Sequence, residues 1–330
     1  MINVASMMRL PAVQNENLEL KNMYKQSLSV VVPIYNDEEV INELLRRLTA
    51  VWETIVKDYE IILVDDGSRD RSWSVMQSER QQREHLRIAR LSRNFGQQNA
   101  IAAGLSLTTR DLIVLMDSDL QDRPEDIPVL MDALLAAPEA TMAIAQWEER
   151  KDSRMKIAVS RLFQRVSNRI TDIHTMPRLG IFRVMKKSVV EELRRFPEKT
   201  ATAVSLLYYI GNKYVAVPLK RDARFAGKSG YNLSKMLALT FARIFSFSMF
   251  PIRMVTYLGA LLCIGSMIAA LALIIYKMMG NVLTGWTSMM VLMLFLFGLN
   301  FAFLGILGEY IGRIFLETKQ RPNFIIEQVL

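Results

Sequence analysis

The stretch DLIVLMDSDLQDRPE, residues 111–125, decides the fold prediction, because a short apolar run ends abruptly in carboxylates. Residues 111–116 have the length and apolar content of a buried parallel strand. Asp117 and Asp119 follow this strand at alternate positions, so both side chains can reach one site. Mg²⁺ prefers oxygen ligands and usually takes one or two carboxylates together with phosphate oxygens. The stretch therefore predicts a metal site at a strand end that suits a diphosphate.

Similar apolar runs alternate with helical patterns through the first half of the chain. The expected strands are 28–33, 59–64, 86–91 and 111–116, and the expected helices are 38–56, 70–84 and one from about 97. This alternation predicts a mostly parallel α/β sheet whose ligands bind beyond the carboxyl ends of the strands. After Pro138 the pattern loosens, and we expect strands at 141–147 and 181–185 and helices at 154–170 and 202–211.

Acidic turns follow two more of the expected strands. In PIYNDE, residues 33–38, Tyr35 can stack on a nucleobase, and Asp37 can hydrogen-bond the base or its ribose. The turn DDGS, residues 65–68, places Asp66 in a comparable position. Each motif alone could be an ordinary turn or a helix cap. Acidic turns at three strand ends of one sheet favour a nucleotide site.

Two apolar segments near the C-terminus predict membrane helices at 253–277 and 286–310, since each is long enough to cross a bilayer. Residues 231–252 alternate apolar and basic residues and predict an amphipathic helix in the membrane interface. Positive charges lie outside the pair of spans rather than between them, at Arg243, Arg253, Arg313, Lys319 and Arg321 against Lys277. This distribution predicts that both termini are cytoplasmic.

Composition excludes several other classes of protein. The net charge of +8 suits anionic lipid, a phosphorylated substrate or positive-inside bias, and no nucleic-acid-binding motif accompanies it. The single Cys263 excludes an intramolecular disulfide, and His85 and His174 are too few for a zinc site. The chain has no P-loop and no dinucleotide-binding glycine motif after its first strand, which argues against kinases, ATPases and dehydrogenases. Residues 1–27 lack the apolar core of a signal peptide and are expected to be a flexible extension.

Six motifs occur in a recognisable order along the chain: PIYNDEE (33–39), DDGS (65–68), LSRNFGQQNAIAAG (91–104), DSDLQDRPE (117–125), FSFSMFPIR (245–253) and LGEYIGRIFLETKQRP (307–322). Together they resemble one family, the polyprenyl-phosphate glycosyltransferases. These are inverting GT-A-fold enzymes related to dolichol-phosphate mannose synthase and to bacterial undecaprenyl-phosphate glucosyl- and aminoarabinosyltransferases. The resemblance covers about residues 28–328 and implies a GT-A domain at 28–230, followed by the interfacial helix, two spans and a cytoplasmic tail at 311–330.

The resemblance also implies roles for individual residues. It implies that Pro33, Tyr35, Asp37 and Asp66 bind the nucleotide. It implies that Asp117, Asp119 and Gln121 bind the metal and diphosphate, and that Asp117, Asp119 and Arg183 are catalytic. The acceptor phosphate would be bound by Arg154, Arg224, Lys228 and Ser229. Two positions depart from the family pattern. Gly230 replaces a lysine of the acceptor loop, for which Lys228 could substitute, and Ile181 stands where several bacterial relatives have an aspartate proposed as the catalytic base. Arg154 and Lys228 could instead belong to a solvated basic surface.

The implied activity is the inverting transfer of one sugar from a nucleoside diphosphate sugar, by analogy a UDP-hexose, to undecaprenyl phosphate. The cofactor would be Mg²⁺ or Mn²⁺, and the enzyme would lie in the bacterial inner membrane. Small residues in the spans would permit packing into a homo-oligomer. A processive polysaccharide synthase is one alternative, although no tryptophan follows an arginine as in its Gln-x-x-Arg-Trp motif. A degenerate membrane scaffold is the other, motivated by Ile181.

Overall fold

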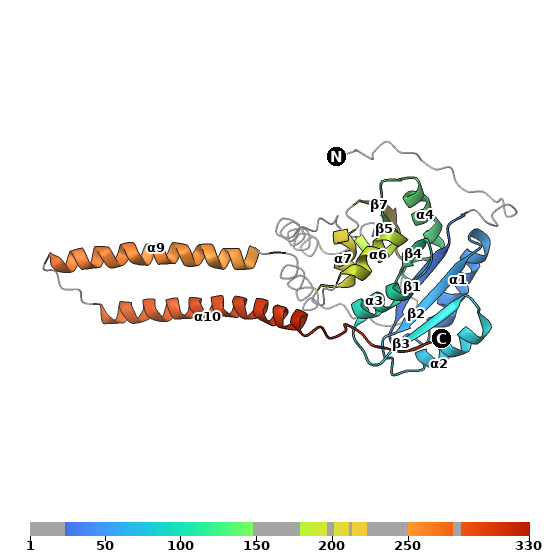
Figure 1. The fold of residues 1–330 in the computed structure, drawn as a ribbon, viewed down its shortest axis with the longest axis horizontal. Coiled ribbons are helices and arrows are strands. Elements are labelled where there is room, and N and C mark those ends of the chain that lie inside the picture. The colour runs from blue at the N-terminus through green and yellow to red at the C-terminus, as the bar shows by residue number, and fades with distance from the viewer. Residues whose placement is uncertain are drawn as a thin grey trace.

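The structure is a computed structural model that describes residues 24–147, 179–196, 201–210, 213–222, 248, 250–279 and 285–330. An α/β domain carries a pair of long helices that project from it side by side (Figure 1). The strands are β1 (Leu28–Ile34), β2 (Tyr59–Asp65), β3 (Leu86–Leu91), β4 (Leu112–Leu115), β5 (Met142–Trp147), β6 (Leu179–Lys186), β7 (Tyr214–Leu219) and β8 (Ile326–Val329). The helices are α1 (Ile41–Ile55), α2 (Ser72–Gln82), α3 (Gln97–Leu107), α4 (Ile127–Leu135), α6 (Lys187–Arg195), α7 (Ala203–Ile210), α9 (Phe250–Met278) and α10 (Trp286–Thr318).

The eight strands form one sheet in the order β7-β5-β6-β4-β1-β2-β3-β8. Strand β1 pairs in parallel with β2 and with β4, β2 pairs in parallel with β3, and β5 pairs in parallel with β7. The antiparallel members are β6, which lies between β4 and β5, and β8 at the edge beside β3. The predicted mostly parallel α/β sheet is confirmed.

Helices cover both faces of this sheet. On one face α1, α2 and α4 close a core around alternate residues of β1 and β2, such as Val30 and Leu63. On the other face α3, α6 and α7 close a second core around Val31 and Ile62. All residues of β1 are buried, as expected for a central parallel strand. The apolar runs of the sequence therefore become strands because both of their faces are covered.

The ends of the domain differ from the expected boundaries. Ordered contacts begin before residue 28, because Tyr24 bridges to Val56 and donates a hydrogen bond to Asp132. Helix α10 continues to Thr318, past the expected end at 310. The expected C-terminal tail at 311–330 contains the last turns of α10 and the strand β8, which pairs antiparallel with β3. A segment of four residues, Ile-Glu-Gln-Val, is too short to give a strand signal in the sequence.

The two C-terminal apolar segments form helices of 29 and 33 residues, α9 and α10. Within the described residues one helical stretch, Phe295–Thr318, is long and apolar enough to cross a membrane, and none of its most apolar window is buried. The described part of α9 contributes a shorter apolar stretch, Phe250–Leu262, so the span at 253–277 stays a prediction. The expected helix at 154–170 and nearly all of the interfacial helix at 231–252 lie outside the described residues.

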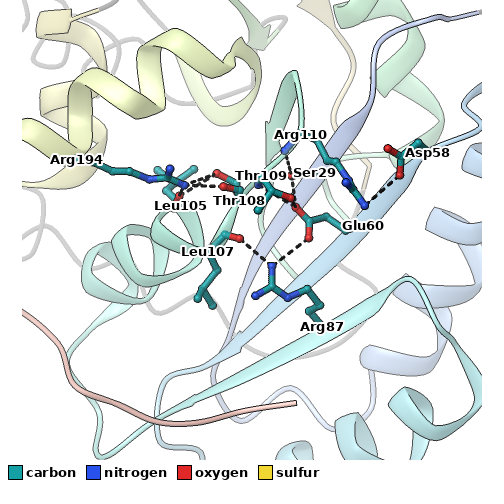
Figure 2. Close-up of polar contacts among 10 residues, drawn as sticks. All are labelled: Ser29, Asp58, Glu60, Arg87, Leu105, Leu107, Thr108, Thr109, Arg110 and Arg194. Atoms are coloured by element: carbon teal, nitrogen blue, oxygen red, sulfur yellow. Dashed lines mark hydrogen bonds and ion pairs between the residues drawn. The ribbon is translucent and has the colours of Figure 1, made fainter.

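A polar network holds the amino ends of the central strands, opposite the acidic turns (Figure 2). Buried Glu60 of β2 accepts hydrogen bonds from the Ser29 hydroxyl at 2.6 Å, the Arg87 guanidinium at 3.2 Å, and the Thr109 amide and hydroxyl at 3.1 and 3.0 Å. Burial raises the pKa of Glu60, but these hydrogen bonds together outweigh it, so the pKa lies below its usual range. The network ties the loop between α3 and β4 to three strands and thereby fixes where α3 ends.

We predict that Glu60→Gln lowers the free energy of unfolding by about 1–3 kcal/mol, because the amide leaves Arg87 without a charged acceptor. Since the folded-state pKa of Glu60 is depressed, its contribution is present above the ordinary glutamate pKa of about 4.3 and disappears as the pH falls below it. Thermal unfolding at neutral and acidic pH measures this difference, which should shrink at low pH. Glu192→Gln, at a side chain that is 49% exposed, is the control and should unfold like the parent. An equal gap between parent and Glu60→Gln at both pH values would contradict the assignment.

Candidate active site

The carboxyl ends of three parallel strands, β1, β2 and β4, lie side by side in the sheet. The register sets Val31 of β1 opposite Leu115 of β4 and Ile34 opposite Asp65 of β2. The residues that follow each strand therefore share one surface, as expected for a parallel sheet. These are the segments that carry Asp37, Asp66 and Asp117, which the sequence predicted to lie together.

Hydrogen bonds join the loop after β1 to the other two turns. The Ser118 hydroxyl donates to Asp37 Oδ2 at 2.6 Å, which ties this loop to the end of β4. The Asn36 amide donates to Ser68 Oγ at 3.0 Å, which ties the loop to the DDGS turn. Burial raises the pKa of Asp37, an effect that the hydrogen bond from Ser118 opposes. Tyr35 is 42% exposed beside them, available for stacking on a ring, whereas Pro33 is buried within β1.

Asp66 is buried at the carboxyl end of β2 and accepts two backbone hydrogen bonds. The donors are the amides of Phe95 at 2.7 Å and Gly96 at 2.9 Å, immediately before α3. Burial raises the pKa of Asp66, and these two hydrogen bonds oppose the rise. Gly67 follows with φ +68°, and a methyl group added there would lie 2.6 Å from the Arg93 carbonyl carbon. Glycine is therefore required for the turn to approach the loop after β3 this closely.

The segment after β4 contains the expected metal ligands. Gln97, the first residue of α3, donates its side-chain amide to Asp117 Oδ1 at 2.8 Å. The Gln121 amide donates to Asp119 Oδ1 at 3.1 Å, across a turn in which Leu120 has φ +55°. The side-chain oxygen of Gln121 is buried and has no hydrogen-bond partner. Such an oxygen, in the same short segment as the carboxylates of Asp117 and Asp119, suits a divalent cation.

The oxygen ligands offered by Asp117, Asp119 and Gln121 suit a metal ion that is also coordinated by a bound ligand, rather than one coordinated by protein side chains alone. Among the residues described, no group of three or more His, Cys, Asp or Glu side chains is arranged to hold an ion. Asp117, Asp119 and Gln121 offer oxygens only, which favours a hard cation such as Mg²⁺ or Mn²⁺. The remaining coordination positions would then be filled by phosphate oxygens or water.

Two residues that the sequence did not single out also belong to this cluster. Asp122 is completely buried, and burial, together with the nearby charge of Asp117, raises its pKa to about 7. The guanidinium of Arg221 lies 3.2 Å from Asp122 Oδ1 and 3.8 Å from Asp117 Oδ2. Asp122 could have been found from the sequence, because it ends the acidic motif DLQD at residues 119–122. Arg221 could not, because it follows the edge strand β7 and no local pattern links it to Asp122.

Arg183 does not reach the carboxylates in the described part of the chain. It is fully buried, donates to the carbonyls of Ile181 and Gly180 at 2.9 Å each, and lies over the Tyr208 ring at 4.6 Å. Its Nη1 has no hydrogen-bond partner. Because β6 pairs Arg183 with Leu115, Ile181 lies two residues further along, next to the end of β4. The expected acceptor residues Arg154, Arg224, Lys228 and Ser229 lie outside the described residues.

Comparison with known proteins identifies the family. A family model described as glycosyl transferase family 2 matches residues 29–194. The bactoprenol glucosyl transferase of Shigella phage SfX is 35% identical over 302 residues, which span 91% of this chain and 98% of that protein. The chain belongs to glycosyl transferase family 2. As a member of that family it is a transferase, as the motifs predicted.

Other similar proteins agree with this assignment. The prophage bactoprenol glucosyl transferase homolog of Escherichia coli K12 is 34% identical over 92% of this chain and 99% of its own length. The uncharacterized glycosyltransferase YkcC of Bacillus subtilis is 35% identical over 91% of this chain and 93% of its own length. Glucosyl-3-phosphoglycerate synthase from Mycobacterium tuberculosis, solved with Mn²⁺, UDP and phosphoglyceric acid, superposes with a TM-score of 0.51 at 18% identity, covering 67% of this chain and 77% of that one. This last likeness supports the GT-A fold of the glycosyltransferase.

We predict that Gly67→Ala weakens UDP binding by roughly tenfold or more and lowers the melting temperature, because the methyl group must displace the turn that carries Asp66. Calorimetric titration of UDP in the presence of Mn²⁺ measures the first effect. Gly285→Ala is the matched control, since no atom lies within 4 Å of the added methyl. Unchanged UDP affinity in Gly67→Ala would show that this turn does not position the nucleotide.

Proposed function

We propose that this glycosyltransferase transfers one sugar from a nucleoside diphosphate sugar, a UDP-hexose, to undecaprenyl phosphate and inverts the anomeric centre. The observation that carries the proposal is the convergence of Asp66, Asp117 and Asp119 at one sheet edge in a chain that also has long apolar C-terminal helices. Two proteins named for bactoprenol glucosyl transfer match it over more than nine-tenths of its length, which supports a polyprenyl acceptor.

The proposed donor site divides its work among the three strand ends. Asp66 and Asp37 would bind the base and ribose, with Tyr35 stacking beside them. Asp117, Asp119 and Gln121 would hold a divalent ion, Mg²⁺ or Mn²⁺, which offsets the charge of the leaving diphosphate when bound. An oxygen of the acceptor phosphate attacks the anomeric carbon from the opposite side. The bond from that carbon to the diphosphate breaks, and the nucleoside diphosphate leaves with the electron pair.

The reaction as proposed does not need a general base at residue 181. A phosphate monoester has a second pKa of about 6, so the acceptor is largely a dianion at neutral pH and carries no proton that must be removed. Positioning and charge stabilisation can then supply most of the acceleration. Ile181 contributes an apolar surface next to the end of β4, and buried Arg183 would fix the backbone at 180 and 181 through its two carbonyl hydrogen bonds.

The proposed location is the bacterial inner membrane, with α9 and α10 as two spans and the catalytic domain in the cytoplasm. Pairing of β8 with β3 supports this topology, because it requires the C-terminal end of the chain to lie on the same side of the membrane as the sheet. The acceptor, which is a lipid, would reach the domain from the bilayer surface near the start of α9. The hydroxyl of Tyr310 on α10 donates to the Ser248 carbonyl at 2.9 Å, which joins α10 to the chain just before α9.

We predict that the purified protein forms a lipid-linked sugar from undecaprenyl phosphate, a UDP-hexose and Mn²⁺ or Mg²⁺, and that Asp119→Ala reduces the rate by at least about 100-fold. Thin-layer separation of radiolabelled lipid product measures the rate across a panel of nucleotide sugars. Asp58→Ala is the control and should retain activity, because its side chain is 56% exposed and lies at the amino end of β2, away from the acidic turns. Nucleotide binding without transfer from any donor would favour a degenerate scaffold instead.

We also predict that Ile181→Asp changes the transfer rate by less than about tenfold at neutral pH, because general-base catalysis adds little to an acceptor that is already ionised. The same lipid-product assay measures it between pH 5.5 and 8. The parent rate should rise with pH through the second ionisation of the acceptor, near pH ~6, and then level off. A rate in Ile181→Asp that exceeds the parent by ~100-fold would mean that the reaction requires a base and that this chain lacks it.

A further inference from the structure

The side chain of Arg221 is held in the metal region by contacts from three directions. Its Nε lies 3.2 Å from Asp122 Oδ1, its Nη2 lies 3.8 Å from Asp117 Oδ2, and its guanidinium lies over the Trp147 ring at 5.1 Å. The side chain is 24% exposed, so it is mostly enclosed but still accessible to solvent. Arginine suits such a position, because its planar group can stack on an aromatic ring and pair with oxygens at the same time.

The backbone around this side chain is also fixed. Strand β7 pairs in parallel with β5, with Trp147 opposite Leu219, so Arg221 follows the same strand ends as Trp147. The amide of Asp222 donates to the Gln121 carbonyl at 3.1 Å, which binds the segment after β7 to the segment after β4. The position of Arg221 near Asp117 is therefore fixed by backbone pairing between segments that are far apart in sequence.

Arg221 and a divalent ion would compete for the same carboxylate. Asp117 is an expected metal ligand, and it already pairs with the guanidinium. A unit positive charge within about 4 Å of a ligand oxygen opposes the approach of a second cation, the more so in a partly enclosed site. Arg221 stays near these carboxylates because Asp122 is buried, its Oδ2 has no hydrogen-bond partner, and the guanidinium 3.2 Å from its Oδ1 balances its charge.

A donor diphosphate removes this conflict, because it supplies negative oxygens for both cations. We infer that Arg221 is a donor-binding residue that pairs with the diphosphate, and that its charge prevents tight metal binding until the diphosphate is present. This inference rests on the proposed donor site. It makes binding of the metal and of the nucleotide cooperative, since each relieves the repulsion that the other would meet. A guanidinium beside the diphosphate would also stabilise the charge that develops as the sugar leaves.

A purely structural role for Arg221 makes a different prediction. If Arg221 only neutralised buried Asp122, its loss would destabilise the fold and lower the affinity for metal and nucleotide together. If Arg221 exchanges between carboxylate and diphosphate, its loss should move the two affinities in opposite directions. The opposite shifts are the signature that separates the two roles.

The test uses the full-length protein with Arg221→Gln and, as control, Arg195→Gln, which removes the same charge from a side chain that is 74% exposed. Electron paramagnetic resonance of free Mn²⁺ measures binding of the metal alone, and calorimetry with saturating Mn²⁺ measures binding of UDP and of uridine. We expect Arg221→Gln to bind Mn²⁺ alone several-fold more tightly and UDP roughly tenfold or more weakly, with uridine unchanged. Arg195→Gln should match the parent in all three titrations.

Arg221→Lys keeps the charge without the planar fork and serves if Arg221→Gln does not fold. It should bind Mn²⁺ alone like the parent and recover only part of the UDP affinity. A parallel loss of Mn²⁺ and UDP affinity in Arg221→Gln, or no change in either, would overturn the inference while leaving the donor site intact. A parent protein that binds no UDP at all would instead overturn the proposed function together with the inference.

Discussion

Parallel pairing of β1 with β2 and β4 is the constraint on which the rest of the structure depends. It brings three chain segments that are some thirty to fifty residues apart in sequence to one edge of the sheet. A shift of one residue in either register would turn every side chain of a strand to the opposite face. Because both faces of β1 are buried under helices, such a shift would place residues of one core in the other. The position of the acidic turns is therefore secured by hydrophobic packing on both sides of the sheet.

The site concentrates negative charge at a cost that the surrounding structure offsets. Burial raises the pKa values of Asp37, Asp66 and Asp122, and the nearby carboxylates add to this effect. Backbone amides before α3 stabilise Asp66, and Arg221 stabilises Asp122. The far end of α3 is held in turn by Arg194, which donates to the carbonyls of Leu105 and Thr108 (Figure 2). Fixing both ends of this helix keeps the Asp66 donors in place.

Local pattern was enough to predict the central strands and the acidic turns that follow them. Apolar runs such as residues 59–64 predict buried strands in a chain that alternates strands and helices. The carboxylates that directly follow these runs are unusual at strand ends and therefore indicate a site. The strand β8 and the position of Arg221 could not be predicted, because both depend on pairing between segments far apart in sequence. Buried Glu60 was hidden for the same reason, since its four donors come from β1, β3 and the loop before β4. The sequence motifs predicted a metal and nucleotide site, while the pairing of distant strands determined which further side chains lie in it.

The most direct test of the account is X-ray diffraction at the manganese absorption edge from crystals of the full chain grown with UDP and Mn²⁺. The account predicts one anomalous peak within coordination distance of Asp119 and next to Asp117, bridged to the diphosphate, with the uridine against Asp66. UDP bound in that position with no manganese at Asp119, or a nucleotide bound away from the ends of β1, β2 and β4, would contradict it.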